Sequence, residues 1–236
     1  QGRERVLRVI IFAQDSNVLT LATVRFESEY FYREDDGCKD TDPTTPCSED
    51  LDVVKQYKGR QVDNKLKSIS YYTGIQSREK LGMVLEYNTT TGTAKSRTEY
   101  NYQADGTDLQ DDGLDETVRY DVKGLADPLA KGTGIKKDYV RFIGSEGQEV
   151  VNYSYRFSAD NVRSTTVFYY EDGSDAGTEL DRAKDVVYEG AELSALVQQD
   201  TYRVDDICKV AEITKANRRS SRYFDIHLGR GGALAN

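Results

Sequence analysis

The 236-residue chain has few of the residues that catalytic and metal-binding sites need. It contains one histidine, His227, one methionine, three cysteines and no tryptophan. A single histidine removes the commonest pairings of a serine or cysteine nucleophile with an imidazole base. Carboxylates are plentiful, so composition does not exclude a glycosidase. However, few apolar residues lie near them in the sequence, and such residues are needed to raise the pKa of a carboxyl group that acts as the acid. We therefore expect that the chain is not an enzyme and that it needs no cofactor.

Long apolar runs, prolines and excess positive charge are also scarce. The longest apolar cluster covers Val9–Ala13, far short of the roughly 20 residues of a membrane-spanning helix. Three prolines argue against a proline-rich linker protein. The formal net charge of −9 argues against a nucleic-acid binder, which needs a basic face. Neither an initiator methionine nor a signal peptide is present, which favours a processed or partial chain.

Aromatic residues at alternating positions are what the chain has in abundance. There are 17 tyrosines and 7 phenylalanines, against an apolar fraction of only 37%. Alternation suits a pleated strand with one face half exposed. We therefore predict an all-β chain of about a dozen antiparallel strands. Short helical turns are expected at Asp50–Tyr57 and Glu192–Gln199 at most.

One pattern recurs three times along the chain. An alternating strand that ends in aromatic residues is followed by an acidic Asp-Gly loop, a Leu-Asp step, a tyrosine and a glycine. Such self-similarity indicates a repeat architecture in which neighbouring units bury each other's apolar faces. The fold predicted is an elongated antiparallel β-repeat array of three tandem units of roughly 65–70 residues, covering 1–70, 71–139 and 140–236. The recurring strands are Val24–Tyr32, Ala94–Tyr102 and Val162–Tyr170; the Leu-Asp steps are Leu51-Asp52, Leu114-Asp115 and Leu180-Asp181; and the closing residues are Tyr57 and Gly59, Tyr120 and Gly124, and Tyr188 and Gly190.

The three cysteines indicate in which cellular compartment the chain resides. Cys38 and Cys47 bracket a short loop with two prolines, which favours a local disulfide and an extracellular or periplasmic setting. A metal site is a weaker interpretation, because there is no second cysteine pair and only one histidine. Cys208 is left over, and such a residue is more often a small buried hydrophobe than an intermolecular link.

The acidic loops recur at the same place in each copy. Carboxylates clustered on a loop with glycine can ligate calcium, although none of these loops has the spacing of a helix–loop–helix calcium site. The alternative is a solvated hairpin tip rich in turn-forming residues. The residues that could bind calcium are Asp105, Asp108, Asp111, Asp112, Asp172 and Asp175.

The tyrosine pairs also allow two interpretations. Alternating tyrosines on an exposed sheet face can stack sugars or line a groove for a protein partner. More often they form a cross-strand ladder that holds the sheet together, and we favour the ladder.

The repeat pattern begins and ends part-way through a unit, which leaves a sheet edge at each end. Open edges recruit strands from other chains unless they are blunted. The Arg-rich first strand and the tail Gly229–Gly232 could provide that blunting, or could be a donated strand with its connector. Residues 206–236 also carry net positive charge, which suits either a solvated surface or contact with the acidic body of a neighbouring copy. The residues expected at an assembly interface are Val6, Val9, Ile11, Tyr223, Phe224 and Ile226.

The cadence of tyrosine-rich strand, Asp-Gly turn and Leu-Asp…Tyr…Gly resembles the tandem hairpin repeats of long bacterial surface proteins. The closest local match to their YD (Rhs-type) repeat is Tyr120-Asp121…Gly124, although the period here, near 70 residues, is several times longer. The resemblance implies an extracellular location and a structural role. We expect an extracellular structural protein that self-assembles head to tail through strand edges into a filament or sheath. The alternative is an adhesin that recognises glycan or protein on tyrosine-lined faces.

Overall fold

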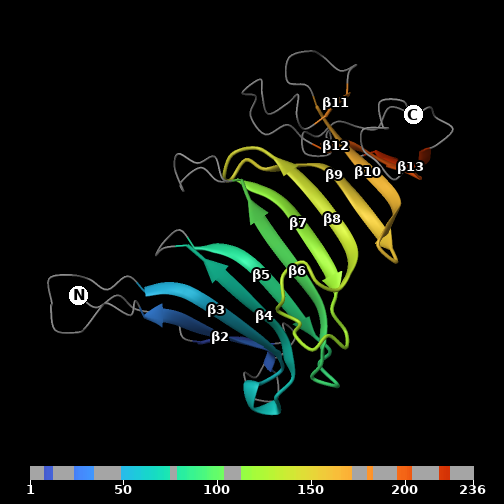
Figure 1. Ribbon diagram of the computed structural model, residues 1–236. Helices are drawn as coiled ribbons and strands as arrows, with labels where there is room; N and C mark the ends of the chain where they lie inside the picture. The colour runs from blue at the N-terminus through green and yellow to red at the C-terminus, as the bar shows by residue number, and fades with distance from the viewer. Residues whose placement is uncertain are drawn as a thin grey trace, which may run out of the picture. The chain divides into compact units, whose positions relative to one another are not determined.

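The computed structural model describes residues 8–12, 24–34, 49–74, 79–103, 113–171, 180–182, 196–203 and 218–223. These residues form thirteen β-strands and one short 3-10 turn, η2 (Gln61–Asp63), and neighbouring strands run antiparallel (Figure 1). The predicted all-β class is confirmed. The described part of the chain contains no helix with the length and apolar character of a membrane span.

The chain divides into two compact units. The first comprises Gln1–Tyr100 and Tyr120–Gly134, and the second Asn101–Arg119 and Ile135–Asn236. Within each unit the strands lie in chain order, except that the short β11 pairs with β10 beside the main path. The repeat boundaries at residues 70 and 139 stay a prediction, because these units reflect packing and not sequence similarity. The strands are β1 (Arg8–Phe12), β2 (Val24–Glu34), β3 (Glu49–Lys58), β4 (Leu66–Thr73), β5 (Lys80–Tyr87), β6 (Ala94–Tyr102), β7 (Leu114–Asp121), β8 (Ile135–Ile143), β9 (Val150–Ser158), β10 (Asn161–Glu171), β11 (Leu180–Arg182), β12 (Leu196–Tyr202) and β13 (Arg218–Tyr223).

The first unit buries one face of its sheet. Ile69, Leu85 and Arg97 oppose one another across β4, β5 and β6, so their side chains share a face, and all three are buried. This follows from the period of two along a strand, which sends alternate side chains to opposite faces. The chain's own connections cover this face: the turn before β4 contacts Glu27, and the β7–β8 connection contacts Arg97.

The second unit has an apolar centre around Tyr170. Tyr170 is buried among Val150, Phe168 and Leu196. Its hydroxyl donates a 2.7 Å hydrogen bond to the backbone carbonyl of Val151, so the polar end of this buried ring is paired.

Two segments expected to be helical are strands instead. Asp50–Tyr57 lies in β3, and the described part of Glu192–Gln199, residues 196–199, lies in β12. In β3 the β-branched pair Val53-Val54 pairs with Phe31 and Tyr30 of β2. Long-range pairing with an aromatic neighbouring strand outweighs the weak local helix preference of the charged residues around it.

Glu79 and Glu149, which lie 70 residues apart at the same position of the second and third copies, make the same contact. The Glu79 carboxylate accepts a 3.2 Å hydrogen bond from the backbone N–H of Leu51, and the Glu149 carboxylate accepts a 3.0 Å bond from that of Leu114. Each leucine opens the Leu-Asp step of its copy. The matched glycines Gly74 and Gly144, which follow β4 and β8, also share a positive φ, at 113° and 127°.

The third copy departs from the sequence match at its closing tyrosine. In the first copy Tyr57 opposes Glu27 of β2. At the position of β10 that matches Glu27, Thr165 is opposed by Tyr202. Tyr202 therefore holds the place assigned to Tyr188, which lies outside the described residues. The sequence match chose Tyr188 instead of Tyr202 because the segment between β10 and β12 is long. Extra residues in a connection shift the numbering of the next strand without changing which residues pair.

Candidate functional site

The outer strands are the candidate sites for contact with another chain. Within the described residues β1 pairs only with β2, and β13 pairs only with β12. Each therefore presents a row of backbone groups that another strand could meet. Val9, Ile11 and Tyr223, three of the residues expected at an interface, are 37%, 48% and 68% exposed. The other three, Val6, Phe224 and Ile226, lie outside the described residues.

The first outer strand is held to its neighbour by a buried charge. Glu27, whose side chain is fully buried, forms an ion pair with Arg8 of β1. The same carboxylate accepts a 2.9 Å hydrogen bond from the backbone N–H of Gln61 in η2. On the other face of β1, Val9 and Ile11 oppose Ser28 and Phe26 and stay exposed. The strand is therefore fixed on one face and apolar on the other.

The last outer strand is held through Asp200 of β12. The buried Asp200 carboxylate lies 3.5 Å from the Arg218 guanidinium and accepts hydrogen bonds from Gln198 (2.9 Å) and Tyr202 (3.1 Å). Burial alone would raise the pKa of Asp200, but contacts with Ser221, Gln198 and Tyr202 and the charge of Arg218 lower it below its usual value. The carboxylate stays ionised and fixes the start of β13.

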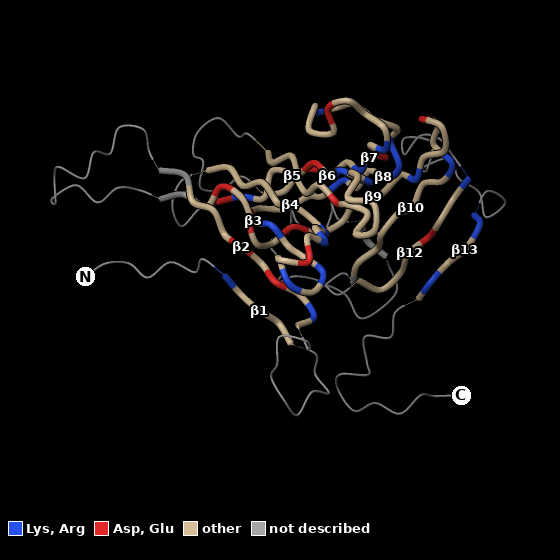
Figure 2. Tube along the Cα trace, turned by 90° about the horizontal axis from the view of Figure 1, so that it is seen from below, with Lys and Arg blue, Asp and Glu red and all other residues tan. Residues whose placement is uncertain are grey.

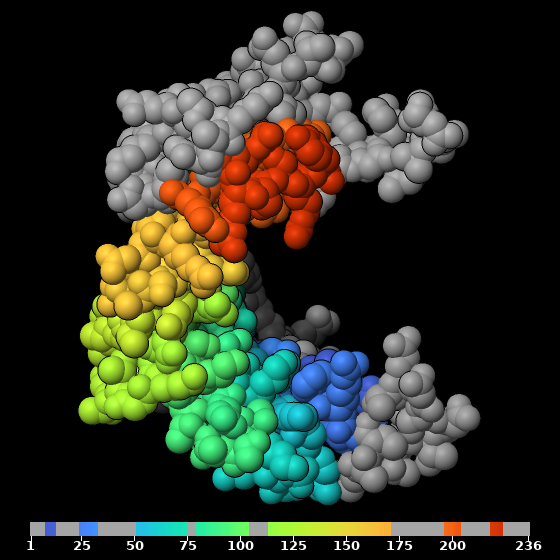
Figure 3. Space-filling model, turned by 90° about the vertical axis from the view of Figure 1, so that its right-hand side faces the viewer, coloured from blue at the N-terminus to red at the C-terminus, as the bar shows by residue number. Residues whose placement is uncertain are grey.

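The two outer strands differ in charge. β13 carries three arginines, Arg218, Arg219 and Arg222, and no acidic residue. β1 carries only Arg8, which is paired with Glu27. Figure 2 shows blue over much of β13 and only at the start of β1. Figure 3 shows residues of β13, in red, at the surface beside those of β12, in orange.

The tyrosines form a ladder on one face of the second unit. Across the strands, the ring of Tyr139 on β8 lies 5.7 Å from that of Tyr155 and 6.0 Å from that of Tyr153 on β9 between centroids; along β9, Tyr155 lies 5.2 Å from Tyr153 and 6.2 Å from Phe157. Burial, followed by a hydrogen bond to Glu116, raises the pKa of Tyr139 above its usual value. These contacts are those of a cross-strand ladder that holds β8 to β9.

The other residues singled out from the sequence lie outside the part of the chain that the structure describes. The calcium candidates Asp105, Asp108, Asp111, Asp112, Asp172 and Asp175 lie outside the described residues, and so do Cys38, Cys47, Cys208 and His227. Among the residues that the structure does describe, no three side chains of His, Cys, Asp or Glu gather as metal ligands would.

Sequence reasoning missed the charged residues of the interior. Arg97 is fully buried and donates to the backbone carbonyls of Pro128 (2.8 Å) and Thr133 (2.7 Å). Glu99 lies 2.8 Å from Arg97 and accepts a 2.9 Å bond from the N–H of Gly132. Glu27, 70 residues before Arg97, is the matched position in the first copy. The sequence did contain a signal for these buried charges: Glu27 and Arg97 stand at the same inward-facing position of the recurring strand in two copies.

A scan against protein-family models gave no match, and searches of curated proteins and of solved structures gave none either.

Proposed function

We propose that this chain is a structural subunit that joins copies of itself head to tail through its outer strands, β1 and β13. The observation that carries the proposal is β1, which pairs on one side only among the described strands, exposes Val9 and Ile11 by 37% and 48% on one face, and is fixed in place by one buried ion pair. A fixed, apolar outer strand is a template for a strand from another molecule.

The charge difference between the edges favours unlike pairing. Two β13 strands placed side by side would bring six arginines together, because each strand carries three. Like charges directly opposite each other destabilise a strand pair. β1 has no unpaired charge among its described residues, so it can accept β13 without this repulsion. Pairing of unlike edges is heterologous, and heterologous contacts extend into filaments unless the rotation closes a ring.

The proposed setting is extracellular, as a filament or sheath on a cell surface. Its support is the sequence, through the closely spaced Cys38 and Cys47 and the cadence that resembles surface repeats. Binding of glycan by the tyrosine pairs has less support, because Tyr170 is buried and its hydroxyl is bonded to the backbone.

The test compares two exposed isoleucines. Ile11 on β1 is 48% exposed, and Ile135 at the start of β8 is 46% exposed. A lysine placed on an outer strand blocks strand pairing with another chain. Light scattering and electron microscopy over a rising concentration series should show assembly of the unmodified chain and of Ile135→Lys, with loss of assembly in Ile11→Lys. An unmodified chain that stays monomeric at every concentration would refute the proposal, as would equal effects of the two lysines.

A further inference from the structure

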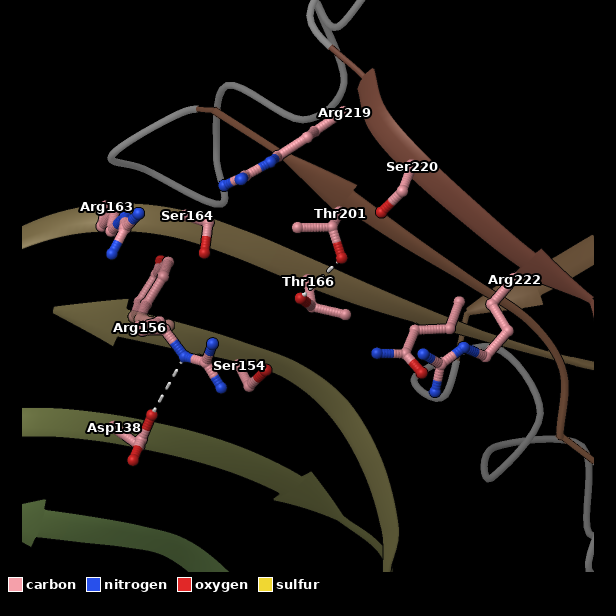
Figure 4. Close-up of a pocket in the computed structure, with 12 residues that line it drawn as sticks. Asp138, Ser154, Arg156, Arg163, Ser164, Thr166, Thr201, Arg219, Ser220 and Arg222 are labelled. Carbon is pink, nitrogen blue, oxygen red and sulfur yellow. Dashed lines mark hydrogen bonds and ion pairs between the residues drawn. The ribbon is translucent and has the colours of Figure 1, made fainter.

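One face of the second unit carries a polar groove. Its volume is about 510 Å³, and strands β8, β9, β10, β12 and β13 line it (Figure 4). All of the lining residues belong to the second unit. Most of the tyrosine ladder lies on the other face, since Tyr139 opposes Tyr155 while the groove residue Asp138 opposes Arg156, and of the ladder residues only Tyr155 also borders the groove. The polar residues of the groove therefore lie on the face opposite Tyr139 and its neighbours in the ladder.

A row of hydroxyl groups crosses the floor of this groove. Thr166 of β10 is directly opposed by Ser154 of β9 and by Thr201 of β12, and Thr201 is opposed by Ser220 of β13. Directly opposed residues of antiparallel strands point to the same face. The hydroxyls of Thr166 and Thr201 lie 3.1 Å apart. Four neighbouring strands thus present an aligned set of hydrogen-bond donors and acceptors.

Two arginines reach the groove through β-bulges. The β9–β10 register shifts between Val162 and Ser164, which leaves Arg163 without a partner across the strand. The β12–β13 register shifts where Thr201 opposes Ser220 and Tyr202 opposes Arg218, which leaves Arg219 in the same position. A bulge redirects the side chain of its extra residue. Both arginines line the groove, and in Figure 4 the Arg219 side chain extends toward Ser164.

The positive charge of the groove is not balanced by the described residues around it. Asp138 is the only acidic residue of the lining, and it is shared by Arg156, at 3.6 Å, and Arg119. Among the described residues, Arg163, Arg219 and Arg222 have no ion pair. No described residue therefore occupies the guanidinium groups of these three arginines, each with donors in a fork that fits an oxyanion.

The first copy shows that this is not a general feature of the repeat. Arg25, the residue matched to Arg163, lies over the ring of Phe26 at 5.3 Å, and Lys67 lies over the same ring at 4.5 Å. The third copy has Ser164 where the first has Phe26. Without the ring, Arg163 loses its cation–π partner and a hydroxyl group takes its place.

The groove is too wide for a single oxyanion. Arg156 and Arg222 lie on β9 and β13, three strand spacings apart, or about 14 Å between backbones. In Figure 4 the guanidinium groups of Arg156, Arg219 and Arg222 lie apart from one another around the hydroxyl row. A matching ligand carries several oxyanions at intervals, with hydroxyl groups between them. The groove's one aromatic lining residue, Tyr155, stacks with Tyr139, so the groove has no free platform for nucleic-acid bases.

We infer that this groove binds an anionic polysaccharide, with Arg163, Arg219 and Arg222 on its sulfate or carboxylate groups and the hydroxyl row on its sugar hydroxyls. The inference does not depend on self-assembly. Binding is therefore measured in the Ile11→Lys background as well as in the unmodified chain, so that a failure of assembly and a failure of binding are told apart.

The experiment titrates the full chain by calorimetry with a sulfated polysaccharide, a carboxylated polysaccharide, neutral dextran, polyglutamate and single-stranded DNA. One of the two anionic polysaccharides should bind, with affinity that falls as salt rises, and dextran should not. The stronger of the two identifies the oxyanion. Failure of both polysaccharides to bind overturns the inference. Equal binding of polyglutamate or of DNA also overturns it, because the groove would then respond to charge alone.

Matched variants locate the binding. Arg163→Gln should weaken binding roughly tenfold, as loss of one charge-assisted contact does. Lys95→Gln is the control, because Lys95 is the bulged basic residue at the matched position of β6. Thr201→Val, which removes a hydroxyl and no charge, should weaken binding to the polysaccharide. Circular dichroism checks that each variant folds, and Arg222→Gln replaces any that does not. Equal losses in Arg163→Gln and Lys95→Gln, or no loss in Thr201→Val, would overturn the inference.

Discussion

Replacing Arg97 by methionine tests whether the first unit depends on a charge buried beneath one of its own connections. The side chain is fully buried, and its guanidinium donates to the carbonyl groups of Pro128 and Thr133. It also lies 2.8 Å from the Glu99 carboxylate and 5.0 Å from the centre of the Tyr120 ring. Methionine has a similar length and keeps most of the packing, so the change isolates the loss of charge and donors.

The expected cost is about 3–5 kcal/mol of the free energy of unfolding, the usual effect of removing one partner from a buried ion pair. Glu99 would keep one hydrogen bond, from Gly132, but would lose its counter-charge at a site where its side chain is 9% exposed. Two backbone carbonyls would lose their donors as well. The double variant Arg97→Met with Glu99→Met should be more stable than the single one, because no buried charge is then left alone.

Urea unfolding measures the stability, and limited proteolysis within 122–134 reports whether the β7–β8 connection has detached. Arg119→Met is the control, because Arg119 pairs with Asp138 but its side chain is 50% exposed. Its expected cost is below about 1 kcal/mol, as for other surface ion pairs. A cost below about 1 kcal/mol for Arg97→Met, with no new cleavage in the connection, would refute the reasoning.

Two further predictions concern the second unit. Gly144→Ala should lower the free energy of unfolding by about 1–3 kcal/mol, because φ is 127° and the new Cβ would lie 2.4 Å from the carbonyl oxygen of Gln148. Gly147→Ala is the control: its φ is 78° and nothing lies within 4 Å of the new Cβ, so it should lower the same quantity by only about 1 kcal/mol in the same urea assay. Burial raises the pKa of Tyr170 to about 12. The stability contributed by its neutral ring is therefore present below about pH 10 and is lost as pH rises toward 12. Tyr170→Phe should remove part of this alkaline loss and cost about 1–3 kcal/mol at neutral pH, because the Val151 carbonyl loses its donor. Unchanged alkaline stability in Tyr170→Phe would contradict the assignment.

Alternation and turn chemistry were enough to predict the three recurring strands, although not β3 and β12, where short helical turns were expected. Val24–Tyr32, Ala94–Tyr102 and Val162–Tyr170 all lie in strands, β2, β6 and β10. The match between Glu79 and Glu149 was visible in the sequence, and the two carboxylates make the same contact. These features are local or repeated, so one chain carries enough information to find them.

The groove could not be predicted because its residues meet only through strand register. Arg163 and Arg219 are 56 positions apart in the chain and line one groove because two bulges redirect them. A bulge depends on how two strands align, and a sequence pattern of period two does not record it. Arg219 and Arg222 were visible as part of the net positive charge of residues 206–236, but their hydroxyl-bearing neighbours on β9 and β10 were not.

The buried charges explain how a chain with so few apolar residues encloses an interior. At one repeat position the three copies place Glu27, Arg97 and Thr165, all with at most 1% exposure. In the first two copies a connection crosses the sheet face and bonds to the charge through its backbone: Gln61 donates to Glu27, and Pro128 accepts from Arg97. The inward face of the sheet is therefore covered by connecting segments that form hydrogen bonds with buried side chains. A more apolar chain would cover this face with a second packed layer of helices or strands. Buried polar contacts of this kind tolerate little change in geometry, because an unpaired partner is costly. Within each unit such a contact also holds the outer strand to its neighbour, Arg8 with Glu27 for β1 and Arg218 with Asp200 for β13, which is the condition that the proposed strand-to-strand assembly would need.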